Sequence, residues 1–439
     1  MDGWRTGQPW QGLRLNISYT FPVTTTARPT DLRINGARLM DRLMSLAEIG
    51  AIDGGGCARL ALTDADRDGR DLVVSWMRDL GLEVTVDTVG NVVGTWSVGG
   101  GGAVMTGSHI DTVRTGGKYD GNLGVLAGLE IIQTVQESGW MPPRPLAVTF
   151  FTNEEGARYA PDMMGSLAYV GGIGVEEVLG TIGIDGSRVG DELLRIGYAG
   201  TTPCPAPAPH AFVELHIEQG PVLEKEGATI GAVTGVQGIS WREVTIEGQS
   251  NHAGTTPMSM RHDPAYAASL IAVFLRDLAR RYGGNQVCTV GKIDLHPNLV
   301  NVVPARAVLT LDVRNTDEGL LRRAESEITE RLDALAAEEG VTITSRQLAR
   351  FEPVEFGESM VTLVEATASN HGLSSMRLPS GAGHDAQMLA RICPSGMVFV
   401  PSHNGISHNP AEHTDTADIV AGCDVLLQMM LTLTTQETP

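Results

Sequence analysis

The stretch "GAVMTGSHIDTVRTGGKYDGNLGVLAGLEIIQTVQESGWMPPRPLAVTFFTNEE" (residues 102–155) decides the fold of this chain. It opens with the strand-like run "GAVMTGSHIDT", continues with helical spacing from about Gly124 to Glu137, and returns to a strand-like run in "PLAVTFFT". Strands that alternate with helices in this way pair in parallel, with the helices packed on the sheet. The stretch therefore predicts an α/β fold with a mostly parallel sheet flanked by helices.

Polar side chains follow both strand-like runs of this stretch. His109 and Asp111 come at the end of the first run, and Glu154 and Glu155 directly follow the second. In parallel sheets, ligands bind outside the carboxyl ends of the strands. We therefore expect the chemistry of this protein to lie at that edge of the sheet.

The order of strand-like and helix-like segments changes near Thr234. From "WREVTIEGQSNHAGTTPM" to "VTITSRQLARFEP" the chain has the order β-α-β-β-α-β, which is typical of the ferredoxin-like split motif. We expect an inserted α+β domain over residues 235–348, between two parts of a catalytic domain at residues 31–234 and 349–439. Residues 1–30 lack the apolar core of a secretory signal, and we interpret them as a flexible leader.

Composition excludes several classes of protein. The chain has 439 residues and a formal net charge of −20, which argues against nucleic acid as a partner. Apolar runs such as "LAVTFF" are too short to span a bilayer. The 5 cysteines are scattered and odd in number, so we expect no disulfide framework and a cytoplasmic location. Small molecules remain as the expected partners.

Side chains that can bind metals recur in five segments that are far apart in the sequence, "GSHIDT", "KYDGNLG", "TNEEGARY", "ELHIEQG" and "GISHNPAEHTD". Their mixture of imidazole and carboxylate groups suits divalent cations. The candidates are His109, Asp111, Asp120, Glu154, Glu155, His216, His408 and Glu412. Asp120 could bridge two cations about 3.5 Å apart, as in two-metal hydrolases.

Each segment alone also has a plainer interpretation. "NEEG" could be a polar turn, and the alternation around His216 could mark a solvated strand face. Taken together, the segments favour a metal site. One glutamate of the pair would bind metal while the other reaches a water molecule, and the Asp111 carboxylate would orient the His109 imidazole.

The motifs "GSHIDTV", "GGKYDGNLGVLAG", "NEEGARY", "ELHIEQGPVLE", "GQSNHAGTTPM", "PNLVNVVPARAVLTLDVRN", "SGAGHDAQ" and "GISHNPAE" carry a resemblance. From about Arg33 to Leu433 the chain resembles the hydantoinase/carbamoylase group of dinuclear metallo-amidohydrolases, which belong with the zinc aminoacylases and carboxypeptidases. Its members include N-carbamoyl-L-amino-acid hydrolases, allantoate amidohydrolases and bacterial-type β-ureidopropionases.

The resemblance implies a role for each matching residue. Glu154 is the general base, Asp111 supports His109, and His252 of "NHAGTTP" stabilises the oxyanion from across a homodimer formed by the inserted domain, which also closes as a lid. The implied metal ligands are His109, Asp120, Glu155, His216 and His408. The predicted substrate-binding residues are Gln219, Asn301, Arg314 and the loop histidine His384.

The expected function is hydrolysis of the ureido C–N bond of an N-carbamoyl-L-amino acid, a substrate with a carboxylate for Arg314, by two divalent ions. Zn²⁺ is the expected metal, with Mn²⁺, Co²⁺ and Ni²⁺ open. Allantoate is an alternative substrate, and an aminoacylase or dipeptidase would use the same ligands. A non-catalytic binding protein on this scaffold is a further alternative, which the intact ligand set disfavours.

Overall fold

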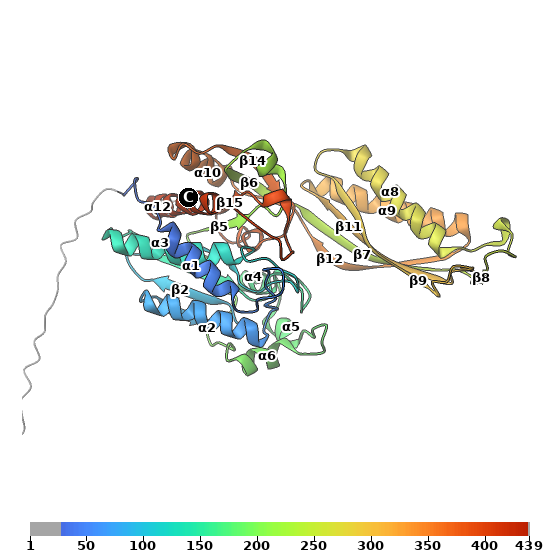
Figure 1. Ribbon diagram of the computed structural model, residues 1–439, viewed down its shortest axis with the longest axis horizontal. Coiled ribbons are helices and arrows are strands. Elements are labelled where there is room, and N and C mark those ends of the chain that lie inside the picture. The colour runs from blue at the N-terminus through green and yellow to red at the C-terminus, as the bar shows by residue number, and fades with distance from the viewer. Residues whose placement is uncertain (1–27, 438–439) are drawn as a thin grey trace, which may run out of the picture.

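The computed structural model describes residues 28–437, so residues 1–27 of the expected leader lie outside the described residues. Figure 1 shows a large body that contains both ends of the described chain and a slender small body that projects from it. The start of the described chain is attached to the large body, because Arg28 Nη1 donates to Gln428 Oε1 over 3.0 Å.

A mixed sheet forms the centre of the large body. Its strands in the described range are β1 (Glu83–Val86), β2 (Val92–Trp96), β3 (Val104–His109), β4 (Leu146–Phe151), β5 (Ala211–Ile217), β6 (Ile230–Val236), β13 (Val354–Glu355), β14 (Ser375–Ser380) and β15 (Ser395–Val400). They follow the order β1-β2-β4-β3-β5-β15-β6-β13, with β14 beside β6. Strands β4, β3, β5 and β15 are parallel to one another, and their residues are buried throughout. This centre confirms the predicted α/β fold.

The two strands that flank the parallel centre run the other way. β2 pairs antiparallel with β4, and β6 pairs antiparallel with β15. Strands that are buried on both faces read as continuous apolar runs, which is why the parallel centre could be recognised in "LAVTFF". The direction of the marginal strands is not encoded in such a run.

Helices cover the sheet of the large body. They are α1 (Gly36–Ala47), α2 (Asp64–Asp79), α3 (Asn122–Ser138), α4 (Met164–Tyr169), α5 (Val175–Gly180), α6 (Val189–Ile196), α7 (Val222–Glu226), α10 (Glu358–Asn370), α11 (Asp385–Leu389), α12 (Thr416–Thr435) and the 3-10 turn η2 (His403–Gly405). The crossover helix α3 packs on β3, β4 and β5. It ends at Gly139, whose left-handed backbone closes the helix.

Helix α12 is long and apolar enough to match a membrane span by length and composition, although we expected the apolar runs of the sequence to be too short for one. In the structure it packs against β5, β15 and α3, and most of its residues are buried. This is the environment of a core helix in a globular body.

The small body has the predicted element order. It consists of β7 (Gly238–Glu247), α8 (Pro264–Tyr282), β9 (Val287–His296), β11 (Arg306–Asn315), α9 (Glu318–Glu339) and β12 (Thr342–Phe351), with β8 (Asn251–His252), η1 (Met258–Met260) and β10 (Val302–Val303) between them. Within residues 28–437, its main sheet has the order β12-β7-β11-β9 and is antiparallel throughout. Both long helices contribute to one apolar cluster beside this sheet. β12 runs past the expected boundary at residue 348.

Candidate metal centre

The candidate ligands come together at the carboxyl edge of the parallel strands. His109 is the last residue of β3, Glu154 and Glu155 follow β4, and His216 lies near the end of β5. Asp120 precedes α3, and His408 lies in the loop between β15 and α12. The site is therefore where an open α/β sheet binds its ligands.

Asp120 lies at the centre of this cluster. Its Oδ1 is 3.2 Å from His216 Nε2 and 3.7 Å from His109 Nε2. Its Oδ2 is 3.3 Å from His408 Nε2, which in turn is 3.2 Å from Glu155 Oε2. The two oxygens of one carboxylate thus face two different sets of donors.

Two groups of ligand atoms fit metal ions, and they share Asp120. One consists of His109, Asp120 and His216, and the other of Asp120, Glu155 and His408; within each group the ligand atoms lie within 4.8 Å of one another. A third group, Glu214, His216 and His384, also meets this criterion. The shared carboxylate is what a bridged two-metal site requires.

The backbone fixes the tautomers of the two buried histidines. His109 Nδ1 lies 2.8 Å from the Asp111 carbonyl, and His216 Nδ1 lies 2.9 Å from the Ile217 carbonyl. A carbonyl can only accept, so Nδ1 carries the proton and Nε2 presents its lone pair to the cluster. Both imidazoles are therefore oriented as metal ligands.

The Asp111 carboxylate makes a different contact from the one we expected. It accepts from the backbone N–H groups of Glu154 (3.2 Å) and Glu155 (3.3 Å), while the backbone carbonyl of Asp111 orients His109. The physical reason is that the turn after β4 presents two unpaired N–H groups to the carboxylate. Asp111 thus connects the "HID" and "NEE" segments.

The electrostatics of the cluster favour cations. Hydrogen bonds to Asp120 and Glu155 raise the pKa of His408 to about 11. Burial lowers the pKa of His109, but the charges of Asp111, Asp120 and Glu155 outweigh it and raise that pKa to about 9. The surplus of negative charge therefore adds to the donor set in favouring divalent ions.

Glu154 differs from its neighbour. Burial and the nearby carboxylates of Asp385, Glu155 and Asp120 raise the pKa of Glu154 well above its usual value. Its Oε2 lies 3.3 Å from His109 Nε2, yet it belongs to none of the three candidate ligand groups in the described chain. A carboxyl group with a raised pKa beside a metal site can accept and return a proton near neutral pH.

Gly121 is required next to the Asp120 carboxylate. Its φ is +65°, and a Cβ at this position would lie 2.4 Å from His109 Cε1. Its backbone N–H points at His216 Nε2 over 3.1 Å. The glycine of "KYDGN" therefore lets the Asp120 loop approach both histidines.

A cavity of about 260 Å³ opens over the cluster. Its walls include the predicted substrate residues Gln219, Arg314 and His384, and also Trp241 of β7 and Asp162. Gln219 Nε2 donates to Asp120 Oδ2 over 2.9 Å. The small body thus contributes Arg314 and Trp241 to the walls.

Two predicted residues are absent from the lining of this cavity. His252 and Asn301 lie near one another, because the Ala253 N–H donates to the Asn301 carbonyl over 2.9 Å. Figure 1 shows β8, which ends in His252, at the end of the small body that is farthest from the large body. A single chain therefore does not bring these two side chains to its own metal cluster.

Comparison with known proteins places this site in a family. Residues 105–432 match the model of peptidase family M20/M25/M40. The chain belongs to this family.

Several members of the M20/M25/M40 family resemble the chain over nearly its full length. An N-carbamoyl-L-amino acid amidohydrolase of Geobacillus stearothermophilus is 40% identical over 408 residues, which cover 90% of this chain and 97% of the relative. An allantoate amidohydrolase of Escherichia coli K12 is 36% identical over 402 residues, covering 89% and 96%. The crystal structure of a hydantoinase/carbamoylase family amidase from Burkholderia multivorans superposes with a TM-score of 0.87 at 42% identity, covering 92% and 99%. The resemblance drawn from the motifs is confirmed.

Glu412 and Arg59 hold the backbone of this M20/M25/M40 site in place. Glu412, a candidate ligand from its sequence, accepts from the backbone N–H groups of Tyr119 (3.1 Å) and Asp120 (3.2 Å) through Oε1. Arg59 is fully buried and donates to the Ile110 carbonyl and to Asn122 Oδ1, both over 2.7 Å. In the sequence, the only signal for Arg59 is a lone arginine in the apolar run "CARLAL".

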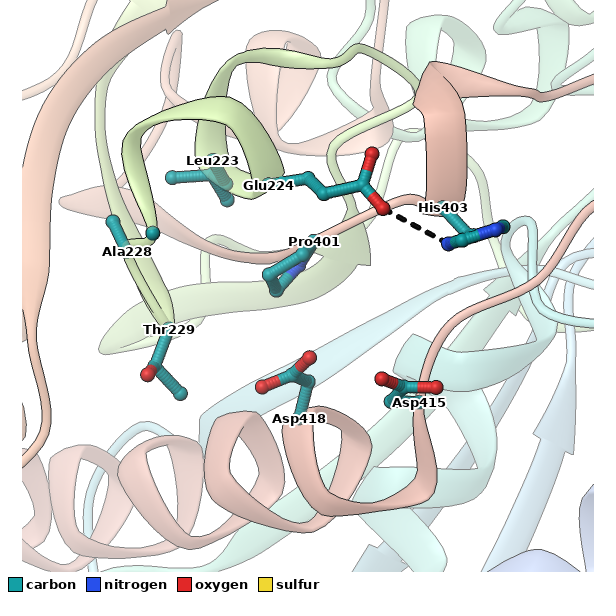
Figure 2. A pocket seen from close by; sticks show the side chains of 9 residues that line it. Leu223, Glu224, Ala228, Thr229, Pro401, His403, Asp415 and Asp418 are labelled. Carbon is teal, nitrogen blue, oxygen red and sulfur yellow. Dashed lines mark ion pairs between the residues drawn. The ribbon is translucent and has the colours of Figure 1, made fainter.

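A separate hollow of about 230 Å³ lies beside the loop that carries His408. In Figure 2, Glu224 and His403 lie beside one another on its wall, with Oε1 and Nδ1 2.9 Å apart. Asp415 and Asp418 also line it; they lie at the N-terminus of α12, where the helix dipole favours acidic residues. The hollow shares no lining residue with the cavity over the metal cluster, so it is not part of that site.

Proposed function

We propose that this chain is a dinuclear metal-dependent amidohydrolase that cleaves the ureido C–N bond of an N-carbamoyl-L-amino acid or a related ureido acid. Water and the ureido group would give ammonia, carbon dioxide and the free amino acid. The observation that carries the proposal is Asp120, whose two oxygens face two ligand groups. The names of the relatives support the ureido substrate.

The proposed metal ligands divide into two sets. His109 and His216 would hold one ion, Glu155 and His408 the other, and Asp120 both. Bound divalent ions would lower the pKa of water and polarise the ureido carbonyl. Zn²⁺ is our first choice, and Mn²⁺, Co²⁺ or Ni²⁺ would suit the same imidazole and carboxylate donors.

Glu154 is proposed to move the proton. Its carboxylate would take a proton from the attacking water and give it to the leaving nitrogen. Its position beside the cluster, outside the ligand groups, supports this role over that of a ligand. The Asp111 carboxylate would hold Glu154 in place through the backbone N–H.

His252 is proposed to donate a hydrogen bond to the developing oxyanion. Its Nδ1 accepts from the backbone N–H groups of Gly254 (3.1 Å) and Thr255 (3.2 Å). The proton of the neutral ring is therefore on Nε2, which makes that atom a donor. Removing one oxyanion donor costs about 3 kcal/mol in other hydrolases.

The position of His252 favours a homodimer in which each small body completes the partner's site. Large apolar side chains are exposed on this body, as expected of an interface. They include Met258, Met260, Tyr266, Val273, Ile293, Leu299 and Val300. Asn301 directly follows the exposed residues Leu299 and Val300. A dimer contact at these residues would therefore bring Asn301 to the partner's site together with His252.

Arg314 is proposed to bind the substrate carboxylate. Its Nε and Nη2 donate to Asp312, and its Nη1 donates to the Gly381 carbonyl. Three of its five N–H groups are thereby engaged, which leaves two for a ligand. Gln219 and His384 would contact the substrate from the opposite wall.

A cytoplasmic location is part of the proposal, because all 5 cysteines are free thiols. Allantoate is the second candidate substrate, because one relative is named allantoate amidohydrolase. Hydrolysis of N-acyl amino acids remains the alternative within the same ligand set.

The proposal is tested by assaying metal-replete protein on a panel of N-carbamoyl-L-amino acids, allantoate, ureidoglycolate and N-acetyl-L-amino acids. We expect ammonia from at least one ureido acid. Release of acetate from the N-acetyl compounds, with no ammonia from any ureido acid, would contradict the ureido specificity.

A further inference from the structure

The guanidinium of Arg314, which lines the metal-site cavity, is bound along one edge by the Asp312 carboxylate. Arg314 Nε donates to Asp312 Oδ1 and Nη2 donates to Oδ2, both over 2.9 Å. Two parallel hydrogen bonds of this kind fix the plane of a guanidinium as well as its position. Asp312 itself is not part of the cavity lining, so it can act on a bound molecule only through Arg314.

The strand β11 places both side chains on one face of the small body's sheet. Residues of β11 alternate between buried and partly exposed, and the buried ones belong to the apolar cluster beside the two long helices. Asp312 and Arg314 are two residues apart, so both point to the face away from these helices. Their cross-strand neighbours on β7 are Trp241 and Ile239, which line the cavity. The spacing in "DVR" therefore directs the pair to the cavity side of the sheet.

A third contact holds the far end of the Arg314 side chain. Nη1 donates to the Gly381 carbonyl of the large body over 2.7 Å. Among the contacts recorded within residues 28–437, one N–H of Nη1 and one of Nη2 are left for a ligand. Because arginine loses much rotamer freedom when it is immobilised, a partner that orients it beforehand reduces the cost of binding a carboxylate.

The negative charge of Asp312 acts in the opposite direction, since it repels a substrate carboxylate on the same guanidinium. The side chains of Arg314 and Asp312 are 21% and 30% exposed, so water screens this repulsion. The orienting effect of Asp312 therefore outweighs its repulsion of the ligand.

We propose that Asp312 is a positioning residue that presents the free N–H groups of Arg314 to the α-carboxylate, and thereby sets the preference for substrates in which this carboxylate is free. The inference rests on the proposed ureido hydrolysis and on the role proposed for Arg314. The carboxylate takes no part in the bond that breaks, so it is bound equally in the ground state and the transition state. Loss of Asp312 therefore raises KM and leaves kcat nearly unchanged.

The test compares N-carbamoyl-L-leucine with N-carbamoyl-L-leucinamide, which lacks the carboxylate. Asp312→Asn keeps the shape of the side chain but replaces one acceptor oxygen with an NH₂ group. We expect kcat/KM for the acid to fall about tenfold, through KM, and the amide to be unaffected. The amide is measured both by ammonia release and as a competitive inhibitor, so it reports on the site whether or not it is hydrolysed.

Two further variants separate positioning from a general effect on the small body. Glu243→Gln is the matched control, because Glu243 accepts from Arg346 Nε over 2.8 Å in the same sheet and neither residue lines the cavity. It should change neither compound. Arg314→Met should abolish the preference for the acid, and adding Asp312→Asn to Arg314→Met should cause no further loss, as expected of two residues that act as one unit.

An equal loss for acid and amide in Asp312→Asn, an unchanged preference for the acid, or a further loss in the double variant would overturn the positioning role and leave ureido hydrolysis intact. An unchanged preference in Arg314→Met would overturn the role of Arg314 and this inference with it. Absence of ammonia from every ureido acid in the wild type would instead overturn the proposed function.

Discussion

The two adjacent glutamates after β4 have different surroundings, and this difference can be tested. Glu155 belongs to a ligand group with Asp120 and His408, whereas Glu154 does not. We expect Glu154→Gln to retain its metal, because the ligands are untouched, and to lose turnover by about 10²- to 10⁴-fold, the usual contribution of a general base. Ammonia release and metal analysis of the same sample provide the measurement. Loss of metal would show that the two glutamates have exchanged roles.

Asp385 gives a prediction about pH and stability. It is fully buried, and its pKa is raised to about 8, first by burial and then by the charge of Glu214. The folded state therefore holds a proton that the unfolded state releases at about pH 4, so stability falls as pH rises from about 4 to about 8.

Asp385→Asn removes this group and should flatten that dependence. Both proteins are compared without metal. We expect the melting temperature of the variant, relative to that of the wild type, to be higher at pH 8 than at pH 5. The melting temperatures of the two proteins, measured in a chelating buffer, report this shift. If the melting temperatures of both proteins changed equally with pH, the pKa of Asp385 would lie near the ordinary value of an aspartate.

For single residues, the sequence identified which side chains belong to the candidate site but not which atoms they contact. His109, Asp120 and His216 were recognisable as candidates because histidine and aspartate at strand ends and in the loops after them favour a metal site. Asp111 orients His109 through its backbone carbonyl, and nothing in "HID" specifies that its carboxylate accepts from the N–H groups of the turn after β4. Asp162 and Trp241 belong to different bodies, and only folding brings them to one cavity.

Arg59 connects the two loops that carry the candidate metal ligands His109 and Asp120. Its guanidinium donates to the Ile110 carbonyl after β3, to Asn122 at the start of α3, and to the Ile49 carbonyl after α1. These partners would be left buried without a donor in an Arg59→Met variant, at a cost of about 1–3 kcal/mol for each.

We therefore expect Arg59→Met to weaken metal binding at least tenfold, measured by competition with a chelator of known affinity. Arg42→Met is the matched control, since Arg42 pairs with Glu130 on α3 and makes no contact with the ligand loops that the structure records. Equal metal affinity of the two variants would show that Arg59 serves only the fold.

The order of elements was the part of the fold most open to prediction. The β-α-β stretch at 102–155 and the β-α-β-β-α-β order of the small body follow from hydrophobic periodicity. Antiparallel margins such as β2 and β6 could not be predicted, because strand direction is set by the connections and partners that a strand finds in space. The apolar α12 likewise reveals its role as a core helix only through the strands it covers.

For the whole molecule, the distance between His252 and the metal cluster of its own chain predicts complementation between subunits. Mixing His252→Ala protein with Asp120→Asn protein should restore activity, because a hybrid dimer has one site with intact ligands and an intact partner histidine. Ammonia release after joint refolding or subunit exchange measures the rescue.

A control mixture defines the background of that experiment. Glu154→Gln and Asp120→Asn each disable catalysis at the site of their own chain, the first through the proposed base and the second through a proposed ligand, so no hybrid of these two has an intact site. Activity in the first mixture no higher than in this control would contradict a contribution of His252 across the dimer.

Sequence predicted this assembly only through the family resemblance. The loops around His252 and Asn301 have no signal of their own for a position far from the candidate metal ligands. The distance of these two loops from the candidate ligands follows from the length of β7 and β9, which extend both loops to the far end of the small body.

We propose above that ureido hydrolysis depends on two ions bridged by Asp120. The most direct measurement is ammonia release from metal-depleted protein titrated with Zn²⁺ or Mn²⁺, with bound metal counted in the same samples. We predict negligible activity without metal, a maximum at about two ions per chain, and loss of activity in Asp120→Asn at every metal concentration. Full activity in the metal-free protein, or a maximum at one ion per chain with Asp120→Asn still active, would contradict the account.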